Sequence, residues 1–302
     1  FKDAIKFKPD FVDAYNNLGT ALNYLGKYEE AIFSYKKAIE FKPDHTKTYN
    51  NLANVLNAIG EDEAAIHSCK KAIALLPSFT EAYWNKHRYS SNISSAIGTL
   101  SRALVTDPFH APSLITVAGL KAITGSADEY KALDRSQYNK DPLKRSFDWF
   151  FDLNENPEIY FDRWQFFDKI IALSDKTRPF YEYGVWMGES FKYLIKTFDK
   201  GYGFDTFTGL PEDWHNEKAG TYSSFGEIPR VQGGEFIVGT FEETLPPFFS
   251  ENRPKASVIN FDADLYSSTL CALRYSQTVI DDKTILIFDE FIGTSNWEQD
   301  EY

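Results

Sequence analysis

The stretch AYNNLGTALNYLGKYEEAIFSYKKAIEFKPD, residues 14–44, is followed three residues later by TYNNLANVLNAIGEDEAAIHSCKKAIALLPS, residues 48–78, and the two align without a gap. Proline and tyrosine recur with a 34-residue period, at Pro9, Pro43 and Pro77 and at Tyr15, Tyr49 and Tyr83. Self-similarity at a period of about 20–50 residues is typical of stacked supersecondary units. The first third of the chain is therefore predicted to be a repeat array.

The pattern resembles the tetratricopeptide repeat, a helix–turn–helix unit whose small residues let the paired helices approach closely. A third copy, AYWNKHRYSSNISSAIGTLSRALVTDP at residues 82–108, is degenerate, because Pro108 lies 31 residues after Pro77. Residues 112–123 are expected to form one helix of a fourth repeat, and residues 1–8 the second helix of an earlier one. The resemblance assigns residues 1–123 to an all-α array whose core is buried only between neighbouring repeats.

Asparagine recurs at one position of the repeat, at Asn17, Asn51 and Asn85. In the family that the pattern resembles, this position faces the groove of the array. An amide both donates and accepts hydrogen bonds, so these side chains are candidates for holding a protein or peptide partner. Two alternatives stay open, namely a solvated polar face and hydrogen bonds between repeats. Arrays this short also serve dimerisation, so a homo-oligomer is a further expectation.

The composition limits the classes of partner. The 302 residues carry a formal net charge of −12, which argues against a nucleic-acid partner because the chain would repel a phosphate backbone. No apolar run approaches the ~20 residues of a membrane-spanning helix. The two cysteines, Cys69 and Cys271, indicate reduced thiols rather than a disulfide framework. We therefore expect a cytoplasmic protein.

Residues 124–146 combine glycine, serine, proline and mixed charges without an apolar period, and they predict a linker. Beyond it, aromatic and aliphatic side chains recur at helical spacing, at Phe161, Trp164, Phe167 and Ile171. This stripe predicts a helix packed against the sheet that follows. The second domain is expected to span residues 147–302.

From Pro179 onward, short apolar runs alternate with helical stretches, which predicts a parallel sheet with crossover helices. The expected strands cover residues 179–185, 201–207, 234–241, 256–266 and 284–291. The fold class is thus α + α/β, with helical repeats followed by a Rossmann-like sheet and flanking helices. In open sheets of this kind, ligands bind beyond the carboxyl ends of the strands.

The segment EYGVWMGES marks the first strand-to-helix turn. Gly184 and Gly188 let the backbone approach a ligand, and Ser190 lies at the start of a helix whose free N–H groups point toward it. Glycine turns are common in α/β proteins, so the motif alone is not specific. Glu182 would repel a pyrophosphate, which argues against a dinucleotide. A cofactor with a positive charge and no phosphate, such as S-adenosylmethionine, fits better.

Asp205 ends the second expected strand, 23 residues after Glu182. An acidic side chain at this place can accept hydrogen bonds from both hydroxyls of a ribose. Thr206 follows directly and belongs to the same candidate cofactor site. The alternative is a turn or helix-capping aspartate. Together with the glycine turn, the position favours ribose binding.

Four carboxylates follow the fourth and fifth expected strands, at Asp262, Asp264, Asp289 and Glu290. Neighbouring parallel strands would bring them together, and like charges raise one another's pKa unless a cation is bound. Several hard oxygen ligands favour Mg²⁺, with Ca²⁺ or Mn²⁺ as alternatives. The structural alternative is a pair of unrelated strand-end aspartates that cap helices.

At these residues a second resemblance becomes specific. The motifs YEYGVWMGES, YGFDTFTGLPEDW, AGTYSSFGEIP, GTFEETLPPF, NFDADLYSSTL and ILIFDEF together resemble the macrocin O-methyltransferase family, over about residues 160–302. Its members are class I methyltransferases that often act on sugar hydroxyls of natural products. The resemblance implies that Asp262, Asp289 and Glu290 ligate magnesium and that Asp264 is the general base. Other members place a histidine base where this sequence has Leu265.

The same resemblance assigns Glu182, Gly184, Gly188 and Asp205 to the methyl-donor site, and residues 220–231 to a mobile lid. Related chains continue past the fifth strand with a helix and two more strands. This sequence ends at Tyr302, so we expect it to be truncated after the fifth strand.

The expected activity is Mg²⁺-assisted methyl transfer from S-adenosylmethionine to a hydroxyl of a sugar, glycan or other small molecule. Asp264 would take the hydroxyl proton, and the repeats would dock a partner or support oligomerisation. The rival hypothesis is a non-catalytic repeat scaffold whose second domain holds a ligand without turnover. The four intact carboxylates argue against that rival. A third hypothesis keeps the fold and the metal but changes the chemistry.

Overall fold

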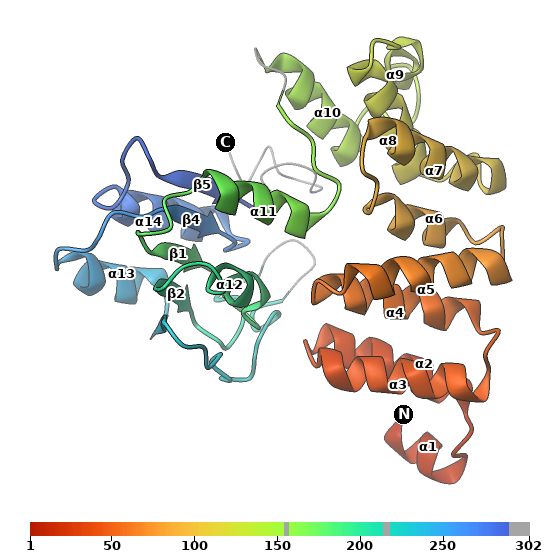
Figure 1. The fold of residues 1–302 in the computed structure, drawn as a ribbon, viewed down its shortest axis with the longest axis horizontal. Coiled ribbons are helices and arrows are strands. Elements are labelled where there is room, and N and C mark those ends of the chain that lie inside the picture. Colours follow the sequence, from red (N-terminus) through yellow and green to blue (C-terminus); the bar gives the residue numbers. More distant parts are fainter. Residues whose placement is uncertain (154–156, 214–217, 290–302) are drawn as a thin grey trace. The chain divides into compact units, whose positions relative to one another are not determined.

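A computed structural model describes residues 1–153, 157–213 and 218–289 (Figure 1). The chain divides into two compact units, Phe1–Trp164 and Gln165–Tyr302. This division falls later than the expected start of the second domain at residue 147. Within the described residues, no helix is both long and apolar enough to cross a bilayer.

The first unit is a stack of helices (Figure 1). Successive antiparallel pairs are α2 with α3, α4 with α5, and α6 with α7. Its helices among the described residues are α1 (Lys2–Phe7), α2 (Val12–Tyr24), α3 (Tyr28–Phe41), α4 (Thr46–Ala58), α5 (Asp62–Leu75), α6 (Thr80–His87), α7 (Ile93–Thr106), α8 (Ala111–Ile123), α9 (Asp128–Leu133) and α10 (Pro142–Asp152). The next helix, α11 (Arg163–Leu173), contains the boundary between the units.

Small residues bring the paired helices together, as the repeat pattern predicts. A Cβ built on Gly19 would lie only 2.7 Å from the ring of Tyr35, so the close approach of α2 and α3 requires glycine there. Alanines at the equivalent positions of the second helices are fully buried, at Ala31, Ala65 and Ala96 and at Ala38, Ala72 and Ala103.

The turns explain why the third repeat is shorter. After α2, the N–H of Gly26 donates to Asn23 O and that of Lys27 to Leu22 O, with Gly26 at a φ of +63°. This is the left-handed glycine cap that ends many helices, and Gly60 repeats it after α4. The third repeat has no glycine there, and α6 has 8 residues where α2 and α4 have 13.

Residues 124–146 contain helical structure rather than an irregular linker. α9 and α10 pack with α8 around Ile115, Tyr130 and Leu133. The ammonium of Lys144 is buried on α10, where it pairs with Asp134 at 2.6 Å and Asp148 at 2.8 Å. The sequence did not indicate this arrangement because α9, with 6 residues, is too short to show a helical period, and α10 begins only at Pro142, near the end of the predicted linker.

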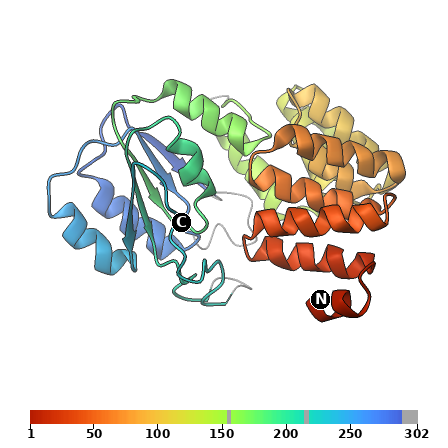
Figure 2. The same ribbon diagram turned by 60° about the horizontal axis from the view of Figure 1, so that its bottom comes forward.

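The second unit contains the predicted parallel sheet (Figure 2). Its strands are β1 (Phe180–Tyr183), β2 (Gly201–Asp205), β3 (Gly234–Val238), β4 (Val258–Phe261) and β5 (Ile285–Phe288). They pair in the order β3-β2-β1-β4-β5, and every neighbouring pair is parallel. The direction of strand addition reverses between β1 and β4, which makes the carboxyl ends of these strands the topological switch point.

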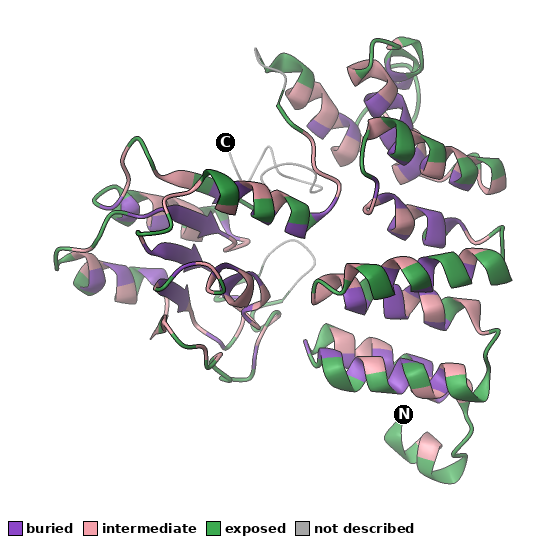
Figure 3. Ribbon diagram, viewed as in Figure 1, coloured by how far each residue is buried: buried purple, intermediate pink, exposed green. Residues whose placement is uncertain are grey.

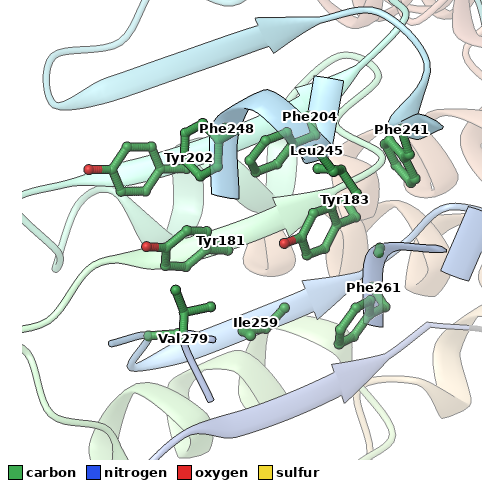
Figure 4. Close-up of a cluster of buried hydrophobic side chains, with 12 residues drawn as sticks. Tyr181, Tyr183, Tyr202, Phe204, Phe241, Leu245, Phe248, Ile259, Phe261 and Val279 are labelled. Atoms are coloured by element: carbon green, nitrogen blue, oxygen red, sulfur yellow. The ribbon is translucent and has the colours of Figure 1, made fainter. Parts of the chain in front are cut away.

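Helices cover both faces of this sheet. The helices α13 (Phe241–Phe249) and α14 (Tyr266–Ser276) cover one face, where aromatic side chains dominate the core (Figure 4). On the other face, Phe191 of α12 (Glu189–Leu194) packs against Phe180, with ring centroids 4.7 Å apart. All residues of β1 and β4 are buried (Figure 3).

The aromatic stripe before the sheet differs from the expectation. Trp164 belongs to the first unit, where its indole N–H donates to Asn57 O at 2.9 Å. Phe167 belongs to the second unit and lies 6.2 Å from the ring of Tyr193 on α12. Because the unit boundary falls between these two residues, the stripe is not a single core face.

Candidate functional site

The turn after β1 is held very close to the end of β4. Gly184 has a φ of +85°, and a Cβ at this residue would lie 1.7 Å from the carbonyl oxygen of Asp262. Gly188 has a φ of +75° and forms the N-terminal cap of α12. Both predicted glycines therefore occupy backbone positions that a side chain would disrupt.

Asp205, at the end of β2, accepts hydrogen bonds from two backbone groups of this turn and from one backbone group of the turn after β2. Its Oδ2 accepts from the N–H groups of Val185 at 2.7 Å and Trp186 at 2.8 Å, and its Oδ1 accepts from Phe207 at 2.6 Å. Thr206 bonds instead to Gly209 O through its hydroxyl, at 2.9 Å. The predicted contact of Asp205 with a ribose stays a prediction. The carboxylate has about four lone-pair sites, so these three bonds leave acceptor capacity.

Backbone strain gathers at the carboxyl edge of the sheet. Trp186 after β1, Phe207 after β2 and Asp264 after β4 have φ values of +47°, +58° and +58°. Left-handed conformations cost about 1–3 kcal/mol each for bulky residues such as Trp186 and Phe207 and less for an aspartate, and they cluster at functional sites. The strain therefore marks the same edge that the strand order identifies as a switch point.

Glu182 lies beneath α12 and is fully buried. Its Oε1 accepts hydrogen bonds from the Ser190 hydroxyl and from Asn260 Nδ2, the latter at 3.1 Å. These contacts tie the start of α12 to β1 and β4. Sequence reasoning assigned no role to Asn260, although a polar residue inside an apolar strand was a visible signal. The assignment of Glu182 and Ser190 to a cofactor stays a prediction.

The backbone brings two of the four predicted carboxylates side by side. Asp262 and Asp289 directly follow the paired residues Phe261 and Phe288, and the Asp289 N–H donates to Phe261 O at 2.9 Å. Asp262 and Asp264 are half-buried, and Asp289 is exposed.

Glu290 lies outside the described residues. Among the residues that the structure does describe, no group of three or more histidine, cysteine or acidic side chains is placed to hold a metal. The magnesium site stays a prediction.

The segment of residues 220–231 is fastened to the turn after β2. The carbonyl oxygen of Phe207 accepts from the Ser224 hydroxyl at 3.2 Å and from Gly226 N–H at 2.9 Å. Tyr222 meets Trp186 edge-on, with ring centroids 5.9 Å apart. The segment thus contacts Trp186 and Phe207, and it contains two further residues at positive φ, Tyr222 at +59° and Phe225 at +56°.

In the first unit, amide side chains bridge successive repeats. Asn51 donates to Asn16 Oδ1 at 3.0 Å, and Asn85 donates to Asn50 Oδ1 at 2.8 Å. We call Asn16, Asn50, Asn51 and Asn85 the asparagine row. The acceptors Asn16 and Asn50 were missed by sequence reasoning, although the doubled asparagine of YNNL recurs with the repeat.

The three predicted groove residues are not equivalent. Asn17 is exposed, Asn51 is half-buried, and Asn85 is buried. Hydrogen bonding between repeats, which the sequence left open as an alternative, is what Asn51 and Asn85 do in the structure. Their binding of a partner stays a prediction.

Comparisons with known proteins identify the repeats. Two tetratricopeptide-repeat family models match the chain, over residues 12–45 and residues 46–76. The N-terminal region therefore contains tetratricopeptide repeats. No curated protein matches the chain.

Several solved structures are similar to parts of the chain. A crystal structure of MamA has 23% identity and a TM-score of 0.40, covering 46% of this chain and 85% of that one. TTC0263, a thermophilic TPR protein in Thermus thermophilus, has 20% identity and a TM-score of 0.37, covering 47% and 83%. The first TPR of Spaghetti (RPAP3), bound to the HSP90 peptide SRMEEVD, has 23% identity and a TM-score of 0.35, covering 38% and 94%.

Proposed function

We propose that the chain is a repeat scaffold whose helical unit docks a protein or peptide partner. The asparagine row is the observation that supports this function most directly. Its bonds fix α2, α4 and α6 relative to one another, so neighbouring polar groups hold their positions before a partner binds. Preorganisation of this kind lowers the entropy cost of binding an extended segment.

The first two repeats would carry most of the contact. Asn17 is exposed and Asn51 half-buried, whereas Asn85 is enclosed. An amide offers both a donor and an acceptor to a peptide backbone. We infer that a partner contacts α2 and α4 more than α6.

The experiment is a screen of immobilised peptides with the intact chain, followed by titration of the strongest binder. Asn17→Ala should weaken that binder about fivefold, since one hydrogen bond contributes ~1 kcal/mol. His67→Ala, on the exposed side of α5, is the matched control and should leave the affinity unchanged. Equal affinity for Asn17→Ala and the unaltered chain would remove the groove from the proposal.

A second proposed function is the O-methyltransferase activity that the sequence resemblance implies. The coincidence of the switch point with Trp186, Phe207 and Asp264 in strained conformations supports a ligand site at that edge. The strand order also equals the first five strands of the doubly wound nucleotide-binding sheet. The acceptor would be a hydroxyl of a sugar, a glycan or another small molecule.

The residues present at the edge fit the proposed groups. Asp205 retains acceptor capacity for a ribose, and Asp262 and Asp289 offer the hard oxygen ligands that Mg²⁺ prefers, with Glu290 completing the predicted set. S-adenosylmethionine would supply an electrophilic methyl group and Mg²⁺ a Lewis acid. Asp264 would remove the proton of the acceptor hydroxyl, and the edge would orient that hydroxyl.

The test of this second function is a calorimetric titration with S-adenosylmethionine, with and without Mg²⁺. If Asp264 is the general base, Asp264→Asn should weaken the binding of S-adenosylmethionine by less than twofold. The same variant should methylate a panel of glycans about 10²–10⁴-fold more slowly. No binding of S-adenosylmethionine by the folded chain would leave the scaffold function standing alone.

A further inference from the structure

A pocket of about 450 Å³ opens between the second and third repeats. Its walls come from α5, α6 and α7, and no residue of the asparagine row lines it. The volume lies within the range of about 300–1,000 Å³ that small-molecule sites usually have. The pocket thus shares no residue with the asparagine row, and all of its lining residues belong to the first unit.

The third repeat departs from the pattern of the first two at two of the positions that line the pocket, Lys86 and Gly98. Leu18 and Leu52 occupy the position that Lys86 takes 34 residues further on. The sixth residue of the second helix is Phe33 in α3 and His67 in α5, but Gly98 in α7. A Cβ built on Gly98 meets no atom within 4 Å. An apolar contact and a large side chain are thus both missing here.

Three cations line this space, namely Lys70, Lys86 and Arg102. No acidic side chain lines it, and among the described residues none of the three cations forms an ion pair. The chain as a whole carries a net charge of −12, so this local excess of positive charge contrasts with the rest of the molecule.

The cations also disfavour one another. Partial burial lowers the pKa of Lys86, and the like charges of Lys70 and Arg102 lower it further. An unpaired, partly buried ammonium is unfavourable until a negative group approaches it. An anion bound in the pocket would offset the repulsion among Lys70, Lys86 and Arg102, whereas a neutral ligand would not.

We propose that this pocket binds a small organic phosphate monoester. Three positive charges exceed the charge of one carboxylate and suit a phosphate dianion, whose oxygens match the planar fork of Arg102. The hydroxyl of Thr99 offers a further hydrogen bond. Ile73 and Ala74 form an apolar wall that would contact the carbon body of the ligand.

The test is isothermal titration of the intact chain with phenyl phosphate at low ionic strength. Lys86→Gln and Arg102→Gln should each weaken binding about 10- to 100-fold, the effect expected for removing a charged hydrogen-bond partner. Lys71→Gln makes the same change of net charge on α5 outside the pocket, and it should change the affinity less than twofold. Gly98→Leu should block binding by filling the space while keeping every charge.

Two comparison ligands separate the parts of the proposal. Inorganic phosphate should bind more weakly than phenyl phosphate because it lacks a carbon body, and benzyl alcohol should not bind. The proposal is overturned if phenyl phosphate fails to bind, if Lys71→Gln weakens it as much as Lys86→Gln, or if Gly98→Leu binds normally. Tighter binding of a phosphoserine peptide than of phenyl phosphate would assign the pocket to a protein ligand instead.

Discussion

Removal of the Asp205 carboxylate should destabilise the second unit whether or not a cofactor binds there. Three backbone N–H groups donate to this carboxylate at 2.6–2.8 Å. A hydrogen bond to a charged group contributes about 1.5–3 kcal/mol when buried, and Asp205 is only half-buried, so each bond takes a value near or below the lower limit. We expect Asp205→Ala to lower the free energy of unfolding by about 2–4 kcal/mol.

Asp205→Asn separates geometry from charge. An amide has one acceptor oxygen where the carboxylate has two, so it can serve either the Val185–Trp186 pair or Phe207, but not both. We expect a loss of about 1–2 kcal/mol, between the unaltered chain and Asp205→Ala.

The measurement is urea denaturation of the intact chain, followed by near-ultraviolet circular dichroism. A two-unit chain need not unfold in one step, so the fit must treat the transition of the sheet separately. Asp199→Ala removes the same charge from an exposed position and should shift the transition by less than about 0.5 kcal/mol, as is usual at a surface. If Asp205→Ala unfolds at the same urea concentration as Asp199→Ala, the hydrogen bonds to Asp205 do not stabilise the second unit, and the prediction is refuted.

The remaining predictions concern the helical unit. Gly98→Ala should raise the free energy of unfolding by about 0.5–1 kcal/mol. Alanine has the higher helix propensity, and its Cβ would meet no atom within 4 Å. Gly119→Ala should lower it by about 1–2 kcal/mol instead, since the new Cβ would lie 2.5 Å from the ring of Phe147; thermal scans that give both variants the same sign would contradict this. Burial lowers the pKa of His87 from 6.5 to about 4, so between these values the unfolded chain binds more protons than the folded one. The free energy of unfolding should therefore fall by up to about 3 kcal/mol as the pH drops through this window. In denaturation measured over a pH series, His87→Gln should show a smaller fall than the unaltered chain, and the control His67→Gln should show the same fall.

The sequence predicted the elements of both units well because their signals are periodic. Pro9, Pro43 and Pro77 set the repeat length, and α2 to α5 follow it. The five strands also occur where short apolar runs predicted them. Carboxyl-edge residues such as Gly184 and Asp205 were found because strand ends are readable in a parallel sheet.

What the sequence could not predict depends on contacts between distant residues. The bond from Asn85 to Asn50 joins residues 35 positions apart, and no local pattern distinguishes it from a solvated amide. The boundary after Trp164 was also hidden, because one aromatic stripe contributes to two cores. Similarly, the position of Asp205 at a strand end is equally compatible with binding a ligand and with holding two turns. Only the structure shows that three backbone N–H groups donate to its carboxylate.

The place where Lys86 replaces leucine also has a consequence for folding. In a stack of repeats, cooperativity comes from coupling between nearest neighbours, so one weak junction divides the array into segments that melt separately. Leu52 belongs to the core that joins the first two repeats, whereas Lys86 occupies the equivalent position on α6, and open space lies beside Gly98 of α7. Amide hydrogens of α6 and α7 should therefore exchange through partial openings in which α2 to α5 stay folded. The junction between the second and third repeats is thus the weakest in the array. A ligand bound across this junction would couple α2 to α5 with α6 and α7, so that all of them unfold in one transition.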